Sequence, residues 1–220
     1  FGAAYRRTLD YAPVSRSEAE RRFLEITEQP VMGDTRSIGA PTGAYPDSFT
    51  KPLDDYLVDF MVGLAGEMGV PAIFHVGLHA WNENRIEAVQ GRHLEPLVRR
   101  HRNVRFVLLH AGMPFIDDAV LLARYFPNVV LNLTWAHIID RARCRELIRC
   151  CVETLAVSKV QGFGGDYMYP QQLHGHLAFA RENLAVVLQD LVREGVMDDE
   201  EALDLARRWL LDNPVRYFGL

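Results

Sequence analysis

Three strand-like segments of the sequence are followed by side chains that can bind a cation or move a proton. His75 and His110 each stand at the end of an apolar run, and Asp166 comes just past a third run. The carboxyl ends of parallel strands meet on one side of a sheet, so these side chains can converge. Imidazole and carboxylate together are ligands for zinc or a similar divalent ion. A single histidine at a strand end is often structural, but three such ends favour a metal site.

The stretch around Asp166 has its own signal. It reads VQGFGGDYMYP over 160–170, where Gly164 and Gly165 interrupt the expected strand 159–163. Glycine adopts backbone angles that other residues avoid and allows a ligand to come close. The alternative is a tight turn in which Asp166 caps the following helix.

Strands and helices alternate along the chain. Apolar runs predict strands at 70–76, 104–110, 128–134 and 159–163. Helical periodicity and capping signals predict helices at 15–28, 53–68, 92–101, 116–126, 141–157, 173–194 and 199–211. This order indicates a single α/β domain over 1–220 with a parallel sheet. An open doubly wound sheet and part of a (β/α)8 barrel both fit, and both carry active residues at strand ends.

Two segments between these elements need separate mention. Residues 53–68 show one continuous apolar stripe, which predicts a helix with Thr50 as its N-cap. Residues 29–50 have no clear period and contain several prolines and glycines, so we expect a long irregular loop. Such a loop is either part of an active site or hides a short strand near residues 30–32.

Composition limits the partners. The 220 residues are 49% apolar and 24% charged, with a net charge of −5, which argues against nucleic-acid and membrane partners. No strand is followed by a dinucleotide or P-loop fingerprint. The three cysteines, Cys144, Cys150 and Cys151, have no zinc-ribbon spacing and fall on one expected helix. They predict small core side chains, reduced thiols and a cytoplasmic location.

Five short motifs, taken together in order, resemble a known family. They are FHVG at 74–77, LLHAGMP at 108–114, ARYFPNVVLNLTW at 123–135, FGGDY at 163–167 and DNPVRYFGL at 212–220. They are similar to the second half of an amidohydrolase barrel of the amidohydrolase 2 type, a group of metal-dependent hydrolases and decarboxylases. The resemblance implies a distorted (β/α)8 TIM barrel in which the four strands here are the fifth to the eighth.

The resemblance also implies roles for the three strand-end residues. His75 corresponds to a metal ligand, His110 to a ligand or catalytic group, and Asp166 to the aspartate that touches the metal and accepts a proton. The implied activity is hydrolysis of a small carbonyl or carboxylate substrate through a metal-bound water, with zinc as the expected ion. Decarboxylation is the alternative.

A second likeness is to the sugar-acid isomerases of the same superfamily. It rests on GLHAWNEN at 77–84 and on Trp135-Ala136-His137. It implies substrate recognition near Asn82, Asn84, Trp135 and His137. Tyr167 follows Asp166 and either lines the pocket or packs at the barrel mouth.

One feature of the family is absent from the sequence. The metal site of the family begins with a His-x-His pair on the first strand, whereas the His-x-His of this chain, His174-Gly175-His176, comes after Asp166. The pair falls in an expected helix, where its histidines point to different faces, so we expect a surface or pocket-edge role. The chain is therefore expected to be the C-terminal half of a larger barrel enzyme, or a catalytically incomplete fragment. We also expect a homo-oligomer, in which a partner chain covers apolar surface.

Overall fold

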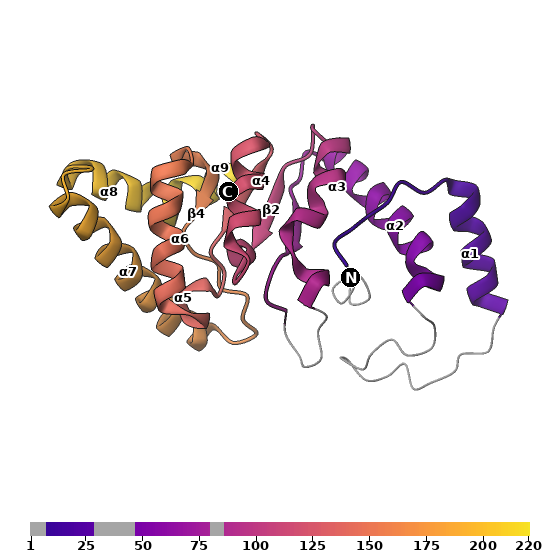
Figure 1. The fold of residues 1–220 in the computed structure, drawn as a ribbon, viewed down its shortest axis with the longest axis horizontal. Helices are drawn as coiled ribbons and strands as arrows, with labels where there is room; N and C mark the ends of the chain where they lie inside the picture. The colour runs from indigo at the N-terminus through magenta and orange to yellow at the C-terminus, as the bar shows by residue number, and fades with distance from the viewer. Residues whose placement is uncertain (1–7, 29–46, 80–85) are drawn as a thin grey trace.

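The computed structural model describes residues 8–28, 47–79 and 86–220. Helices and strands alternate along most of this length (Figure 1). In chain order the elements are α1 (Arg16–Glu28), α2 (Asp47–Met68), β1 (Ala72–His75), η2 (Ile86–Val89), η3 (Gly91–Leu94), α3 (Glu95–Arg100), β2 (Phe106–Leu109), η4 (His110–Gly112), α4 (Ile116–Tyr125), β3 (Val129–Asn132), α5 (Ala136–Ile139), α6 (Arg141–Thr154), η5 (Val157–Lys159), β4 (Val160–Gln161), α7 (Pro170–Arg193), α8 (Asp199–Arg207), η6 (Arg208–Asp212) and α9 (Asn213–Phe218).

The four described strands form one parallel sheet in the order β1-β2-β3-β4. Phe74 of β1 is in register with Leu108 of β2, and Leu131 of β3 is in register with Val160 of β4. Each strand pairs with the next one along the chain, as in the wall of a barrel, whereas a doubly wound sheet reverses its order at a switch point. The sequence prediction of four parallel, consecutive strands is confirmed.

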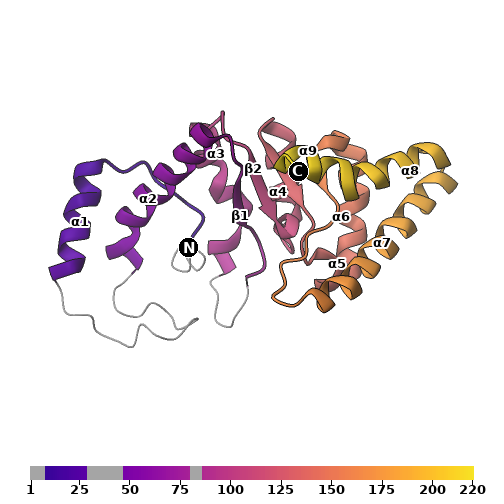
Figure 2. The same ribbon diagram turned by 180° about the vertical axis from the view of Figure 1, so that it is seen from behind.

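Helices α3, α4 and α6 lie on one side of the sheet, and the reversed view places the strands in front of them (Figures 1 and 2). Phe106, Leu108 and Leu131 are fully buried between sheet and helices. Such nearly continuous apolar strands are typical of a parallel sheet that is covered by helices. This core fixes the strand ends from which the candidate site is built.

The predicted start of α2 is wrong. The helix begins at Asp47, inside the expected loop 29–50, so Thr50 lies within the helix and does not cap it. The helix buries Val58 and Val62, whereas five members of its apolar stripe are between 40% and 68% exposed: Leu57, Phe60, Met61, Leu64 and Met68. Periodicity identifies an apolar face but not the partner that covers it. Residues 29–46 of the expected loop lie outside the described residues.

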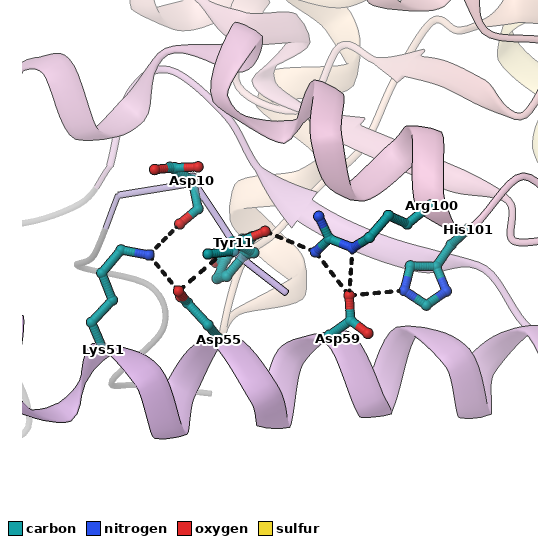
Figure 3. A network of polar contacts seen from close by, with 8 residues as sticks. Asp10, Tyr11, Lys51, Asp55, Asp59, Arg100 and His101 are labelled. Atoms are coloured by element: carbon teal, nitrogen blue, oxygen red, sulfur yellow. Dashed lines mark hydrogen bonds and ion pairs between the residues drawn. The ribbon is translucent and has the colours of Figure 1, made fainter. Parts of the chain in front are cut away.

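Two acidic residues of α2 hold neighbouring segments in place (Figure 3). Asp55 accepts hydrogen bonds from the Lys51 ammonium at 2.5 Å and from the Ala12 amide at 3.2 Å. One turn later, Asp59 accepts two hydrogen bonds from Arg100, at 2.8 and 2.9 Å. These bonds join residues 10–12, α2 and the end of α3 into one unit beside β1.

Two smaller features belong to the C-terminal half. A capping box starts α8, because the side chains of Asp198 and Glu201 each accept a hydrogen bond from the other residue's backbone amide. None of the three cysteines forms a disulfide, and Cys144 and Cys151 are buried as expected. Within the described ranges, no helix has both the length and the apolar character to cross a membrane.

Candidate metal centre

In three of the four segments that follow the strands, a non-glycine residue has a left-handed backbone. The φ angles are 61° at His110, 61° at Trp135 and 50° at Asp166, and Ala111 follows His110 at 45°. A non-glycine residue in this region costs about 1–2 kcal/mol. Strain of this kind concentrates at functional sites, where the fold holds a side chain in a required direction. Here it affects two of the three residues that the sequence singled out for chemistry.

His75, His110 and Asp166 come together at the carboxyl ends of β1, β2 and β4. One potential ligand atom from each lies within 4.8 Å of the other two. The closest pair is His75 Nδ1 and His110 Nε2, which are 2.9 Å apart. The convergence expected from the sequence is therefore present.

The surroundings of the two histidines favour their neutral forms. Burial and the neighbouring His110 lower the pKa of His75 to about 4, although Asp166 acts in the opposite direction. Burial also lowers the pKa of His110. The His110 Nδ1 atom lies 3.0 Å from the Thr134 carbonyl oxygen, and a carbonyl only accepts. Nδ1 therefore carries the proton, and the Nε2 lone pair faces His75.

Two glycines allow the strand ends to approach one another. A Cβ atom on Gly77 would lie 2.1 Å from the Met113 carbonyl oxygen, so only glycine fits beside the turn after β2. The amide of the next residue, Leu78, donates to that same oxygen at 2.6 Å. On the other side, a Cβ atom on Gly164 would lie 2.0 Å from Thr134 Oγ1. The sequence prediction that glycine permits a close approach near Asp166 thus has a steric cause.

An aromatic pair stands next to the cluster. The rings of Trp135 and Tyr167 stack with centroids 5.8 Å apart, and Trp135 lies 6.1 Å from the His110 ring. The Trp135 indole N–H donates to the Gly165 carbonyl oxygen at 3.0 Å, which ties β3 to the turn before Asp166. Trp135, which the resemblance assigned to substrate recognition, is thus near the cluster, and so is Tyr167, which was expected to line the pocket or to pack at the barrel mouth.

His137 lies elsewhere. It is 1% exposed, with Nε2 at 2.8 Å from the Gly162 carbonyl oxygen and Nδ1 at 3.4 Å from Cys144 Sγ. Both ring nitrogens are engaged within the core, so the structure does not favour the expected contact between His137 and substrate. Asn82 and Asn84, the other two predicted contacts, lie outside the described residues.

The His-x-His pair is divided between surface and interior. His174 is exposed on α7, in agreement with a surface role, whereas His176 is only 3% exposed, which excludes a surface role for it and leaves the pocket-edge alternative. The His176 ring packs against Phe163 and Tyr167, at centroid distances of 4.9 and 5.6 Å. Burial and the nearby His137 lower the pKa of His176 to about 4. Neither histidine belongs to the cluster around His75.

Four further polar residues are buried in this region, and the sequence interpretation missed all of them except His79, which was expected to face the pocket or cap the turn. His79 is buried near His75, with ring centroids 6.4 Å apart, and Asn132, Thr134 and Gln161 are buried where β3 and β4 end. A signal for the last three was available, because polar residues at the end of an apolar strand need a reason. His79 is also beside an apolar cavity of about 370 Å³ between α2 and β1, which extends to His75.

The donor set of the cluster fits a divalent metal ion. It offers two neutral imidazole nitrogens and one carboxylate, the set that zinc uses in sites with an open position. The His75 and His110 nitrogens converge on one space, and the Nδ1 proton of His110 is held by a carbonyl, as is usual for metal-binding histidines.

Comparison with known proteins agrees with this geometry. The sequence pattern of the family described as Amidohydrolase matches residues 43–220. The chain belongs to the amidohydrolase family. A relative of this amidohydrolase chain is the protein fluG of Emericella nidulans, which is 26% identical over 98% of this chain and 25% of its own length.

Solved structures extend the likeness to the fold of the amidohydrolase chain. A protein from Lactobacillus casei assigned as a metal-dependent hydrolase superposes with a TM-score of 0.76 at 18% identity, over 99% of this chain and 53% of its own. A uronate isomerase from Thermotoga maritima gives a TM-score of 0.75 at 14% identity, over 96% and 48%. A glucuronate isomerase from Caulobacter crescentus gives 0.73 at 17% identity, over 97% and 45%. The chain thus has the architecture of part of such a barrel and spans about half the length of these structures.

Proposed function

We propose that this chain forms the metal-binding part of a metal-dependent hydrolase that acts on a small carbonyl or carboxylate substrate. The observation that carries the proposal is the convergence of His75, His110 and Asp166, with ligand atoms within 4.8 Å of one another. A divalent cation at this position, with zinc as our first choice, would act as a Lewis acid on a substrate oxygen and would acidify water.

The protein side chains have separable roles in this proposal. His75 and His110 hold the cation through neutral nitrogens, and the proton on His110 Nδ1 leaves Nε2 as a ligand rather than as a proton donor. Asp166 is exposed at the mouth of the cluster, where it can contact substrate and accept a proton from the attacking water. The Trp135–Tyr167 pair offers a flat apolar wall on which a substrate can be oriented.

Metal analysis tests the proposal directly. Equilibrium dialysis against zinc, followed by elemental analysis, should give about one ion per chain for the wild type and a large loss for His75→Ala, because that variant removes a ligand. His174→Ala is the matched control, since His174 is an exposed histidine of α7. Equal zinc content in the wild type and both variants would exclude the cluster as the metal site.

Substrate class is decided by a second assay. Two of the structures similar in fold are sugar-acid isomerases, which supports isomerisation of a uronate as the second candidate. Small esters, amides and lactones, carboxylic acids for decarboxylation, and uronates should be tested side by side with the metal-loaded protein. Turnover of uronates alone would replace the hydrolase assignment. Metal binding without turnover would favour the catalytically incomplete alternative, in which residues from outside this chain are required.

A further inference from the structure

We propose that Asn132 and Gln161 are positioning residues that hold His110 in its metal-binding orientation. The inference rests on the proposed function, because it concerns a ligand of the proposed metal. Its basis is a series of hydrogen bonds from β4 to the cluster that is linked through the backbone of Thr134. Asn132 Nδ2 donates to Gln161 Oε1 at 2.7 Å, the Thr134 amide donates to Asn132 Oδ1 at 2.9 Å, and the Thr134 carbonyl lies 3.0 Å from His110 Nδ1.

The direction of every bond in this line is determined by the backbone. The Thr134 amide can only donate, so the atom that it meets on Asn132 must be the amide oxygen. Asn132 therefore turns its NH2 group toward Gln161, which must present its own oxygen. At the other end, the Thr134 carbonyl can only accept, so His110 must be protonated on Nδ1. The line thus specifies one tautomer of His110.

The arrangement is unfavourable as a purely structural feature. Asn132, Thr134 and Gln161 are at most 7% exposed, and Gln161 Nε2 has no hydrogen-bond partner among the described residues. A buried donor without a partner costs about 1–3 kcal/mol, and apolar residues of the same shape would avoid that cost. The Asn132–Gln161 pair leaves the Gln161 Nε2 donor unsatisfied, so it does not stabilise the core as well as apolar residues would. Its presence is better explained by its effect on the orientation of His110.

Asn132, paired with Thr134, also guides the chain toward Asp166. A Cβ atom on Gly164 would lie 2.0 Å from Thr134 Oγ1 and 2.5 Å from Asn132 Oδ1, so the backbone rests directly on these two side chains. Asp166 follows two residues later. Thr134 Oγ1 itself donates to Asn132 Oδ1 at 2.5 Å, which holds the surface on which Gly164 rests. One polar pair therefore locates two of the three proposed ligands.

The test is the tautomer of His110 in the full chain, read from the ring ¹⁵N chemical shifts of histidine-labelled, metal-free protein. The wild type should show Nδ1 protonated and Nε2 unprotonated. Asn132→Leu should shift His110 toward a mixture of tautomers and lower zinc affinity by about 10–100-fold. Asn132→Asp retains an oxygen for the Thr134 amide and should retain the wild-type tautomer.

Asn183→Leu is the matched control, because Asn183 is an equally buried asparagine whose NH2 group donates to the His137 carbonyl, away from the cluster. Unchanged ¹⁵N shifts in Asn132→Leu, or the same change in Asn183→Leu, would overturn the proposal. If Asn132→Leu does not fold, Gln161→Leu is the second variant, and it should produce a smaller change in the same direction. The tautomer is read without metal, so a wild type that shows the Nδ1-H tautomer but binds no zinc refutes the proposed function and leaves the positioning role standing.

Discussion

His75 and His110 face each other as neutral imidazoles because His110 is buried and His75 is half-buried, which lowers the pKa of both. Asp166 differs from them in being exposed, although its backbone is left-handed. Two residues are thus arranged as ligands inside the sheet, and the third stands where substrate and solvent reach it. This difference in exposure assigns metal binding to the two histidines and proton transfer to Asp166.

The substitution Asp166→Asn tests that separation. It keeps the volume of the side chain but removes the base, so kcat should fall by about 10²–10⁴-fold while thermal stability changes little. Asp190→Asn, at an exposed carboxylate of α7, should leave kcat unchanged. Both variants are compared in steady-state assays on the substrate identified above and in thermal melts. Near-normal turnover by Asp166→Asn would remove Asp166 from the mechanism.

The residues of the candidate site lie at the junctions where the strands pass into loops. After β2 and β3 the chain turns through left-handed residues, and after β4 it passes over Thr134 before it reaches Asp166. Each junction depends on the one beside it, because Gly164 rests on the end of β3 and the Trp135 indole N–H binds the Gly165 carbonyl oxygen. The junctions therefore form a connected layer at one edge of the sheet.

Gly164→Ala should disturb that layer. The added methyl would lie 2.0 Å from Thr134 Oγ1, so we expect a loss of about 1–3 kcal/mol in the free energy of unfolding, with weaker zinc binding. Gly175→Ala is the contrasting control, because its methyl would meet no atom within 4 Å and lies inside α7, where alanine is favoured by about 0.5–1 kcal/mol. Urea denaturation measures both changes, and equal stabilities for the two variants would contradict the steric argument.

Sequence patterns located these elements well but not the contacts between them. Apolar runs placed the four strands, and polar residues at their ends identified His75, His110 and Asp166, because both signals are local. The orientation of α2 and the burial of His176 depend on what packs against each helix, and one-dimensional periodicity does not contain that information. Asn132 and Gln161 carry a sequence signal as polar residues at strand ends, but their pairing across two strands exists only in the folded sheet.

At the scale of the whole molecule, the described chain has a well-packed sheet and a poorly covered end. The helices α1 and α2 extend to one side of the sheet (Figure 1) and expose large apolar side chains, among them Phe23, Leu57 and Phe60. Contiguous apolar surface of this kind marks an interface. The chain also spans only about half the length of the solved structures that it resembles.

We expect the isolated chain to self-associate through this face. Phe60→Glu places a charge on the exposed side of α2 and should shift sedimentation toward the monomer, with little change in the stability of the fold. Leu203→Glu is the matched control, because Leu203 is an exposed leucine of α8, away from α2. A wild type that stays monomeric across a wide concentration range, or equal effects of the two variants, would show that this face does not mediate association.

The order of the sheet also governs how the site is made during translation. Each strand pairs with the one synthesised just before it, so the pairings can form in succession as the chain leaves the ribosome. The ligands of the cluster follow the same order, with His75 first, His110 second and Asp166 only after β4 has been added. A nascent chain that has not yet reached β4 therefore has the imidazoles of His75 and His110 but lacks the carboxylate of Asp166. The two nitrogen ligands are synthesised first, and the oxygen ligand is added last.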